Sequence, residues 1–306
     1  MTGVAVQVDQ LTKKYGAQLA VDGLSFSVPE GAIFGLLGPN GAGKSTTFGA
    51  ICGWLQPAWG STSVLGVPSS RLHTLFGKVT ALPQDARFPD AIPIVAQLAH
   101  QARLCGMSAR EAATEAERVL ALVDLGDAAR KRGDELSHGM AKRAGIAQAM
   151  IGNPRVVLLD EPTAGLDPAN ARRLREVIVA MAPAATVGVS SHNLAEIQDI
   201  CTHGAIIDHG KLVRAGTIAE LTRQGNELVV WVRAGADVPV AALERAFGGG
   251  SVTRDDVSVR IVHGDAGDGA EAVATAMRVL LDAKVPVLGV TRGTSLETAF
   301  LELTGR

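Results

Sequence analysis

GPNGAGKST, at residues 38–46, is the stretch that decides the fold. It follows GAIFGLLG at 31–38, a short apolar run typical of a buried strand, and we expect a helix to begin at about Lys44. The glycines followed by Lys44 and Ser45 fit a phosphate-binding loop, which belongs between a strand and a helix. Glycines let backbone amides approach a phosphate without a Cβ atom in the way, and the helix start adds partial positive charge.

Every residue of this loop is a candidate contact for the phosphates of a nucleotide: Gly38, Pro39, Asn40, Gly41, Ala42, Gly43, Lys44, Ser45 and Thr46. Lys44 has the length and charge to reach the β- and γ-phosphates. The Ser45 hydroxyl is a candidate ligand of Mg²⁺, because this cation prefers oxygen donors. The loop therefore predicts a nucleoside-triphosphate site.

VVLLDE at 156–161 supplies a second part of the same site. An apolar strand carries two carboxylates to the edge of a sheet, which is where α/β proteins bind nucleotides. We expect Asp160 to hold Mg²⁺, directly or through water, and Glu161 to orient and polarise the attacking water. The loop and these strands predict an α/β fold of the P-loop NTPase type.

Composition limits the other possibilities. The chain has 306 residues, of which 47% are hydrophobic, and its 29 basic and 31 acidic residues leave a net charge of −2. Charges of both signs are dispersed, so we expect no nucleic-acid partner. The cysteines, Cys52, Cys105 and Cys201, are far apart and are expected to be reduced core thiols. We also expect no signal peptide and no membrane span, since no apolar run reaches about 18 residues.

The order of apolar and polar runs predicts two domains. Residues 1–222 are expected to form the α/β domain, with a helical insertion at about 86–152 in which 94–131 looks helical throughout. Residues 225–306 alternate strand and helix and predict a small α+β accessory domain. Within it we expect loops at GGGS, 248–251, and at GDAGDG, 264–269. SVTRDD, before VSVRIVHG, is a candidate for a further strand.

DELSHGMAKR at 134–143 stands where the ATP-binding-cassette (ABC) ATPases carry their signature, usually LSGGQ. The sequence resembles that family over about 220 residues, with the motifs in the family's order. The resemblance implies ATP and Mg²⁺ as cofactors. It also implies head-to-tail pairing with a second ABC ATPase subunit, expected to be an identical copy. The signature helix of one subunit then faces the γ-phosphate of ATP bound by the other.

The signature residues suit that role. Ser137 is a good helix N-cap whose hydroxyl can also donate to phosphate, and Gly139 permits close backbone approach. His138 replaces the first glycine of the family pattern, and Met140 replaces the usual glutamine. We expect a working site with weaker sugar contacts, and a solvated His138 without a chemical role.

Four further residues match family motifs. Tyr15, in TKKYG, stands where an aromatic residue stacks on adenine, and Gln84 stands where a glutamine touches Mg²⁺ or water. Asp167, in AGLDP, matches the carboxylate of the loop that crosses to the partner. His192 matches the switch histidine that contacts the γ-phosphate.

SLETAFLELTG at the end of the chain and DHGKLVRAGT at 208–217 resemble ATPases of bacterial exporters of drugs, lipids and other amphiphiles. The implied function is an ATP-hydrolysing subunit that powers export through a separate integral membrane permease, at the cytoplasmic face of the cell membrane. Two alternatives stay open. One is a soluble ABC ATPase of the iron–sulfur assembly type, and the other is a nucleotide-dependent regulator without turnover, against which Glu161 and His192 argue.

Overall fold

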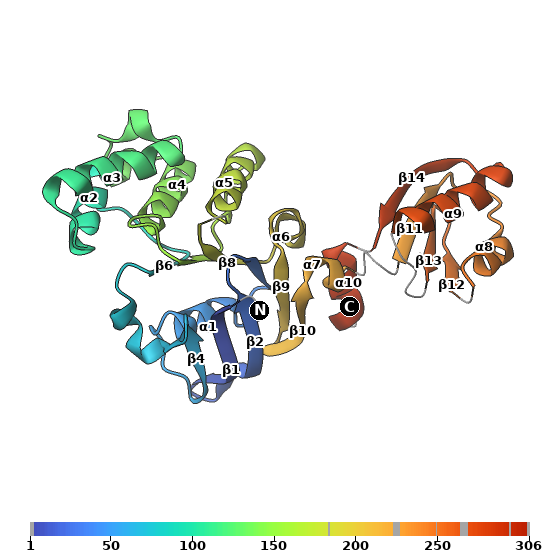
Figure 1. Cartoon of the computed structure of the whole chain (residues 1–306), viewed down its shortest axis with the longest axis horizontal. Coiled ribbons are helices and arrows are strands. Elements are labelled where there is room, and N and C mark those ends of the chain that lie inside the picture. The colour runs from blue at the N-terminus through green and yellow to red at the C-terminus, as the bar shows by residue number, and fades with distance from the viewer. Residues whose placement is uncertain are drawn as a thin grey trace. The chain divides into compact units, whose positions relative to one another are not determined.

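The structure is a computed structural model that describes residues 3–182, 184–222, 227–248, 250–263, 269–293 and 295–304. The chain divides into two compact units, Met1–Ala215 and Gly216–Arg306 (Figure 1). The division lies slightly before the boundary at about residue 222 that the sequence suggests. The assignment of the units as a nucleotide-binding domain and an accessory domain remains a prediction.

A six-stranded sheet with the strand order β10-β9-β3-β8-β7-β6 positions the site in the first unit. Its strands are β3 (Ile33–Leu37), β6 (Val79–Leu82), β7 (Val156–Asp160), β8 (Thr186–Ser191), β9 (His203–Asp208) and β10 (Lys211–Thr217). The pairs β9–β3, β3–β8, β8–β7 and β7–β6 are parallel, and every residue of β3, β7 and β8 is buried. Parallel alignment brings the carboxyl ends of these strands to one edge, as the α/β prediction requires.

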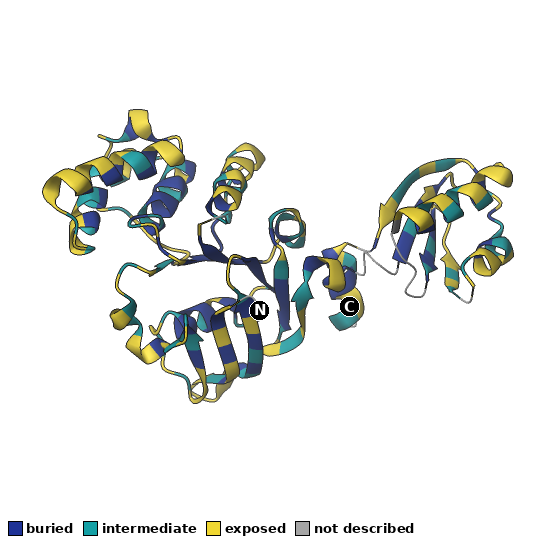
Figure 2. Cartoon of the chain, viewed as in Figure 1, coloured by how far each residue is buried: buried dark blue, intermediate teal, exposed yellow. Residues whose placement is uncertain are grey.

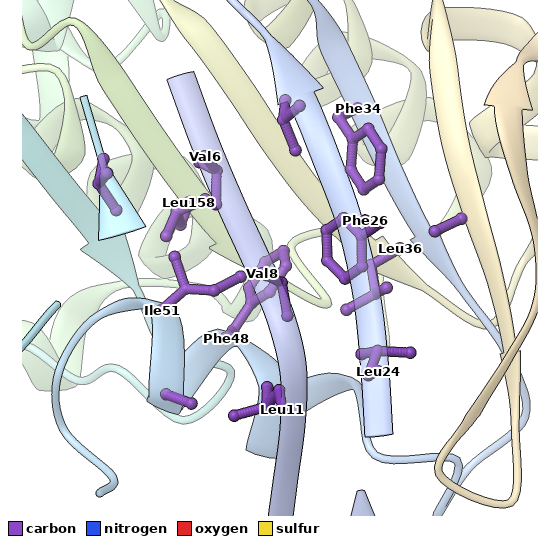
Figure 3. Close-up of a cluster of buried hydrophobic side chains, with 14 of the residues drawn as sticks. Val6, Val8, Leu11, Leu24, Phe26, Phe34, Leu36, Phe48, Ile51 and Leu158 are labelled. Carbon is purple, nitrogen blue, oxygen red and sulfur yellow. The ribbon is translucent and has the colours of Figure 1, made fainter. Parts of the chain in front are cut away.

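A second, antiparallel sheet has the order β2-β1-β4-β5 and consists of β1 (Val4–Tyr15), β2 (Gln18–Pro29), β4 (Trp59–Val64) and β5 (Val67–Pro68). It is followed by a short 3₁₀ helix, η1 (Ser69–Leu75). Helix α1 (Lys44–Ile51) contributes to one buried cluster that joins strands of both sheets (Figure 3). Members of this cluster are Val6, Val8, Leu11, Leu24, Phe26, Phe34, Leu36, Phe48, Ile51 and Leu158. The phosphate-loop helix is thus anchored in the core.

Three helices lie between β6 and β7, as the predicted insertion requires: α2 (Ile94–Leu104), α3 (Ala109–Leu122) and α4 (His138–Ala149) (Figure 1). The expectation that 94–131 is helical throughout is wrong. Gly106 has a left-handed φ of 90° after α2, and Ser108 then starts α3 with a capping box to Glu111. Beyond α3 the chain forms two short 3₁₀ turns, η2 (Gly126–Ala128) and η3 (Gly133–Glu135).

Arg143 connects two of these helices. Its side chain on α4 is buried, and its Nη1 donates to the carbonyls of Val123 and Asp124 at 2.9 Å each. These carbonyls follow α3 directly, where a helix leaves acceptors without intrahelical donors. The guanidinium therefore satisfies the end of α3 from a neighbouring helix.

The second unit contains an antiparallel sheet with the order β12-β13-β11-β14. Its elements are α7 (Ile218–Leu221), β11 (Glu227–Val232), α8 (Val240–Ala246), β12 (Ser251–Arg254), β13 (Ser258–Val262), α9 (Gly269–Asp282), β14 (Val287–Arg292) and α10 (Leu296–Thr304). Strand residues alternate between buried and exposed in places along this sheet (Figure 2). This bears out the predicted α+β class. The strand β12 is the further strand that SVTRDD offered, so Ser251 begins a strand and does not end the GGGS loop. The predicted loop at 264–269 falls almost entirely outside the described residues.

The remaining helices of the first unit are α5 (Pro168–Met181) and α6 (Leu194–Ile200). Among the residues that the structure describes, none of the helices combines the length and the hydropathy needed to cross a bilayer.

Candidate active site

Residues 38–43 turn tightly from β3 into α1. Glycine is needed in this turn where φ is positive or where another backbone segment leaves no space for a Cβ atom. Gly43, the N-cap of α1, has a φ of 102°, and a Cβ there would lie 2.7 Å from the carbonyl oxygen of Ala20. A Cβ on Gly38 would lie 2.3 Å from the carbonyl oxygen of Ile207. The loop has the shape that the sequence predicts, with the N-terminus of α1 opening toward a cavity.

Lys44 is almost completely buried at the start of α1. Its Nζ donates to the carbonyls of Gly38 and Pro39 at 2.7 and 3.2 Å, and it lies 3.1 Å from Oε1 of Glu161. Oε1 of Glu161 is buried and within ion-pair range of Lys44, but it has no hydrogen bond of good geometry. Oε1 of Glu161 is therefore positioned by electrostatic attraction to the Lys44 ammonium and not by a hydrogen bond.

Glu161 follows β7 with a left-handed φ of 46°, which is unusual for a residue with a long side chain. Ser190 on β8 fixes the pair of carboxylates. Its Oγ accepts from the backbone amide of Glu161 at 2.9 Å and donates to Oδ1 of Asp160 at 2.5 Å. Sequence reasoning missed this hydroxyl, because its role depends on the alignment of β7 beside β8.

His192, after β8, completes the cluster. Its Nδ1 lies 2.9 Å from Oε2 of Glu161, while half of its side chain remains exposed. Glu161 thus stands between a cation and an imidazole, with a different oxygen facing each. Such an arrangement holds a carboxylate in one orientation at the edge of a cavity.

That cavity has a volume of about 590 Å³ and brings most of the predicted residues together. Its lining includes Asn40, Gly41, Gly43, Lys44, Ser45, Thr46, Gln84, Glu161 and His192, and also Gln18, Leu19, Ala20 and His209. Gly38, Pro39 and Ala42 shape the loop without lining the cavity, and Asp160, which precedes Glu161 in the chain, is buried and also outside the lining. The Ser45 side chain is exposed toward this space.

Lys142 links the signature helix to this site, and sequence reasoning missed it. Its Nζ donates to the carbonyl of Gln84 at 2.8 Å. Burial lowers the pKa of Lys142, and the charges of Asp85, Asp160 and Glu161 oppose that shift. This side chain is a second ammonium group in the neighbourhood of Asp160 and Glu161.

Comparison with known proteins identifies this arrangement. A family model described as "ABC transporter" matches residues 21–164. The daunorubicin/doxorubicin resistance ATP-binding protein DrrA of Streptomyces peucetius is 33% identical over 310 residues, spanning 98% of this chain and 92% of that protein. The chain belongs to the ABC transporter family. It is an ATP-binding subunit and an ATPase, as the resemblance implied.

Two further matches agree. The Nod factor export ATP-binding protein I of Rhizobium sp. (strain N33) is 32% identical, and the match covers 100% of this chain and 99% of that protein. A solved ATP-binding subunit of an ABC transporter is 27% identical with a TM-score of 0.65, covering 72% of this chain and 92% of its own. The first unit accordingly has the fold of an ABC cassette.

The signature of this ABC cassette lies outside the cavity, packed against the segment that follows Glu161. Ser137 caps α4, as predicted, by accepting from the amide of Met140 at 3.3 Å. His138 is exposed, as expected, but its Nε2 lies 3.3 Å from the carbonyl oxygen of Ala164. A Cβ on Gly139 would lie 3.0 Å from the side chain of Asn170. A side chain at position 139 would therefore require the Asn170 side chain of the same subunit to shift.

Two other family residues also lie outside the lining. Asp167 is the N-cap of α5, and hydrogen bonds from Asn170 and Ala169 hold its pKa below the ordinary value. Tyr15 is half exposed at the end of β1, paired with Gln18, and its ring has the Lys13 ammonium 5.5 Å from the centroid. Tyr15 thus stands at the turn that leads into the lining residues Gln18, Leu19 and Ala20.

Proposed function

We propose that this ABC cassette uses ATP hydrolysis to drive export of an amphiphilic compound through a separate membrane permease. The observation that carries the proposal is similarity along almost the whole chain, including the second unit, to proteins named for drug resistance and for Nod factor export. A cassette match alone would support only the ATPase. The full-length match favours the exporter branch over a soluble ABC ATPase.

The triphosphate binds on loop 38–46 in this proposal. Backbone amides of the loop and the start of α1 face the phosphates, and the Lys44 ammonium exchanges its loop carbonyls for β- and γ-phosphate oxygens. Tyr15 stacks on the adenine. His192 contacts the γ-phosphate from the exposed part of its ring, while its Nδ1 stays beside Glu161.

The residues at the site fit Mg²⁺. The exposed Ser45 hydroxyl, the Asp160 carboxylate and the Gln84 side chain offer oxygen atoms, which this cation prefers, and phosphate oxygens complete such sites. When bound, Mg²⁺ neutralises charge on the phosphates. Glu161 orients and polarises the attacking water, because its buried Oε1 still lacks a hydrogen-bond donor of good geometry.

Assembly completes the site. A second copy pairs head to tail, so that Ser137 and the backbone at Gly139 face the γ-phosphate of the partner's ATP. Asp167 lies on the loop that crosses to the partner. The pair is held at the cytoplasmic face of the membrane by the permease.

The test is purification and reconstitution. The tagged Glu161→Gln variant is purified with MgATP from detergent-solubilised membranes of the source cell, and the polytopic protein that co-elutes in a fixed ratio is identified. That protein and the wild-type cassette are then placed in liposomes preloaded with a fluorescent amphiphile. ATP-dependent efflux that is absent with Glu161→Gln is expected. Elution of Glu161→Gln without any polytopic partner, from a protein whose wild-type form hydrolyses ATP on its own, would favour the soluble ABC ATPase.

A further inference from the structure

The turn between β9 and β10 consists of His209 and Gly210, both in the left-handed region, with φ of 47° and 79°. A two-residue connection with two positive φ angles is the type I′ turn that matches the twist of a hairpin. Histidine tolerates the first of these positions better than most residues. The turn therefore has regular geometry, which fixes the backbone position from which the His209 side chain projects.

Three contacts fix this turn against the phosphate loop and β2. The amide of Gly210 donates to the carbonyl of Ala42 at 3.1 Å, and its carbonyl accepts from the amide of Asp22 at 2.9 Å. The Lys211 ammonium lies 3.3 Å from the carboxylate of Asp22. The tip of the hairpin is thus part of the wall of the cavity.

The His209 side chain lines that cavity with its surface open to solvent. Its Nδ1 lies 3.0 Å from Oδ2 of Asp208, which orients the ring. In the described part of the chain Nε2 has no partner, so this nitrogen is available to a ligand. The proposed roles of the other cavity residues do not account for this histidine.

Lys44 contacts Glu161 within this lining, and the γ-phosphate is placed beside that pair. Gln18, Leu19 and Ala20 also line the cavity, and they follow the turn at Tyr15, which is proposed to stack on the adenine. Gly210 lies against the backbone of Ala20. A bound triphosphate with its γ-phosphate beside Glu161 therefore directs its nucleoside toward Ala20 and His209.

We propose that His209 contacts the nucleoside half of ATP, with Nε2 hydrogen-bonded to the sugar hydroxyls, and not the β- and γ-phosphates. The inference rests on the proposed placement of the triphosphate on loop 38–46. Met140 replaces a residue expected to reach the sugar from the partner subunit. His209 supplies a sugar contact from within the subunit that binds the nucleotide.

The experiment uses His209→Asn and His209→Gly, since both residues accept a left-handed φ without strain. The full chain is titrated by calorimetry with MgATP and, separately, with magnesium tripolyphosphate, which has phosphates but no nucleoside. The Kd for ATP should rise about fivefold, which corresponds to ~1 kcal/mol, while the Kd for tripolyphosphate stays unchanged. His203→Asn, at the other end of β9, is the matched control and should change neither value.

Two results would overturn the inference. An ATP affinity within twofold of wild type in both variants would show that His209 makes no contact. Equal weakening for ATP and tripolyphosphate would place the histidine on the phosphates. Lys44→Ala tests the placement of the triphosphate on loop 38–46 separately from the role of His209. It should weaken the binding of both ATP and tripolyphosphate. Unchanged tripolyphosphate binding in Lys44→Ala would overturn the placement of the triphosphate, and the inference with it.

Discussion

Glu161→Gln should abolish most ATP turnover while ATP binding is kept or strengthened. Glutamine has the shape of glutamate, so the left-handed backbone at 161 and the hydrogen bond from its amide to Ser190 remain possible. It loses the charge that polarises water. Removing a positioned general base costs about 10²–10⁴-fold in rate, so turnover should fall within that range.

The effect on binding follows from Lys44. Its side chain and that of Glu161 are each 6% exposed, and breaking a buried ion pair costs about 3–5 kcal/mol. Lys44 keeps its bonds to Gly38 and Pro39 in the variant, so we expect the lower end, about 3 kcal/mol. The cost falls on the nucleotide-free protein, because bound phosphate would provide Lys44 with another anion. The Kd for MgATP should therefore stay equal or fall, and ATP should raise the melting temperature more than in wild type.

The assay compares phosphate release, MgATP affinity and melting temperature with and without MgATP. Glu176→Gln on the exposed face of α5 is the control, because its partner Arg172 is also exposed. Turnover within tenfold of wild type would refute the role of Glu161 as the base. A Kd for ATP raised tenfold or more would refute the competition between Glu161 and phosphate for Lys44.

Lys44→Ala should remove most ATP binding and turnover, because the phosphates lose their nearest cation and Glu161 loses its ion pair; normal hydrolysis would place ATP elsewhere. Gly139→Asp should abolish ATP-driven dimer closure and turnover, since a Cβ there already lies 3.0 Å from Asn170 and a carboxylate would face the partner's phosphate. Its own ATP binding should persist, and loss of binding would show a local folding defect instead. His138→Gly should keep turnover within a fewfold of wild type at every pH; loss of the acid-side limb of the pH–rate profile would show that the imidazole takes part. Burial raises the pKa of Cys52 to about 12, so at pH 8 its thiolate fraction is about 10⁻⁴ and iodoacetamide should label it only after denaturation.

The loop, the buried strands and the two carboxylates were predictable because each is encoded locally. The apolar runs ending at Leu37 and Asp160 determine which elements are buried, and parallel pairing then brings their ends together. The break between α2 and α3 was also readable, since Ser108 and Glu111 have the spacing of a capping box. The alanines and leucines on both sides of this break favour helix, and they led to the prediction of one continuous helical region.

Contacts between distant segments were not predictable. Ser190 reaches Asp160 only because β8 lies beside β7, and His209 reaches the cavity only because the hairpin contacts Ala42. The family pattern accounts for a glycine at position 139 by the close approach of ATP bound to the partner subunit. The structure shows that Asn170 of the same chain is also close to this position. Long-range pairings of this kind carry no periodic signal in a single sequence.

Arg143 has a consequence for how the helical insertion unfolds locally. The last carbonyls beyond α3 take their hydrogen bonds from a side chain on α4, so α3 has a satisfied end only while α4 is in place. The two helices therefore belong to one cooperative unit of local unfolding, although a connection with two short 3₁₀ turns separates them in the chain. In hydrogen exchange, the amides of the final turn of α3 and those of α4 would lose protection together, with a shared opening free energy. A peptide that ends at residue 125 would fray at the end that Arg143 caps in the whole protein.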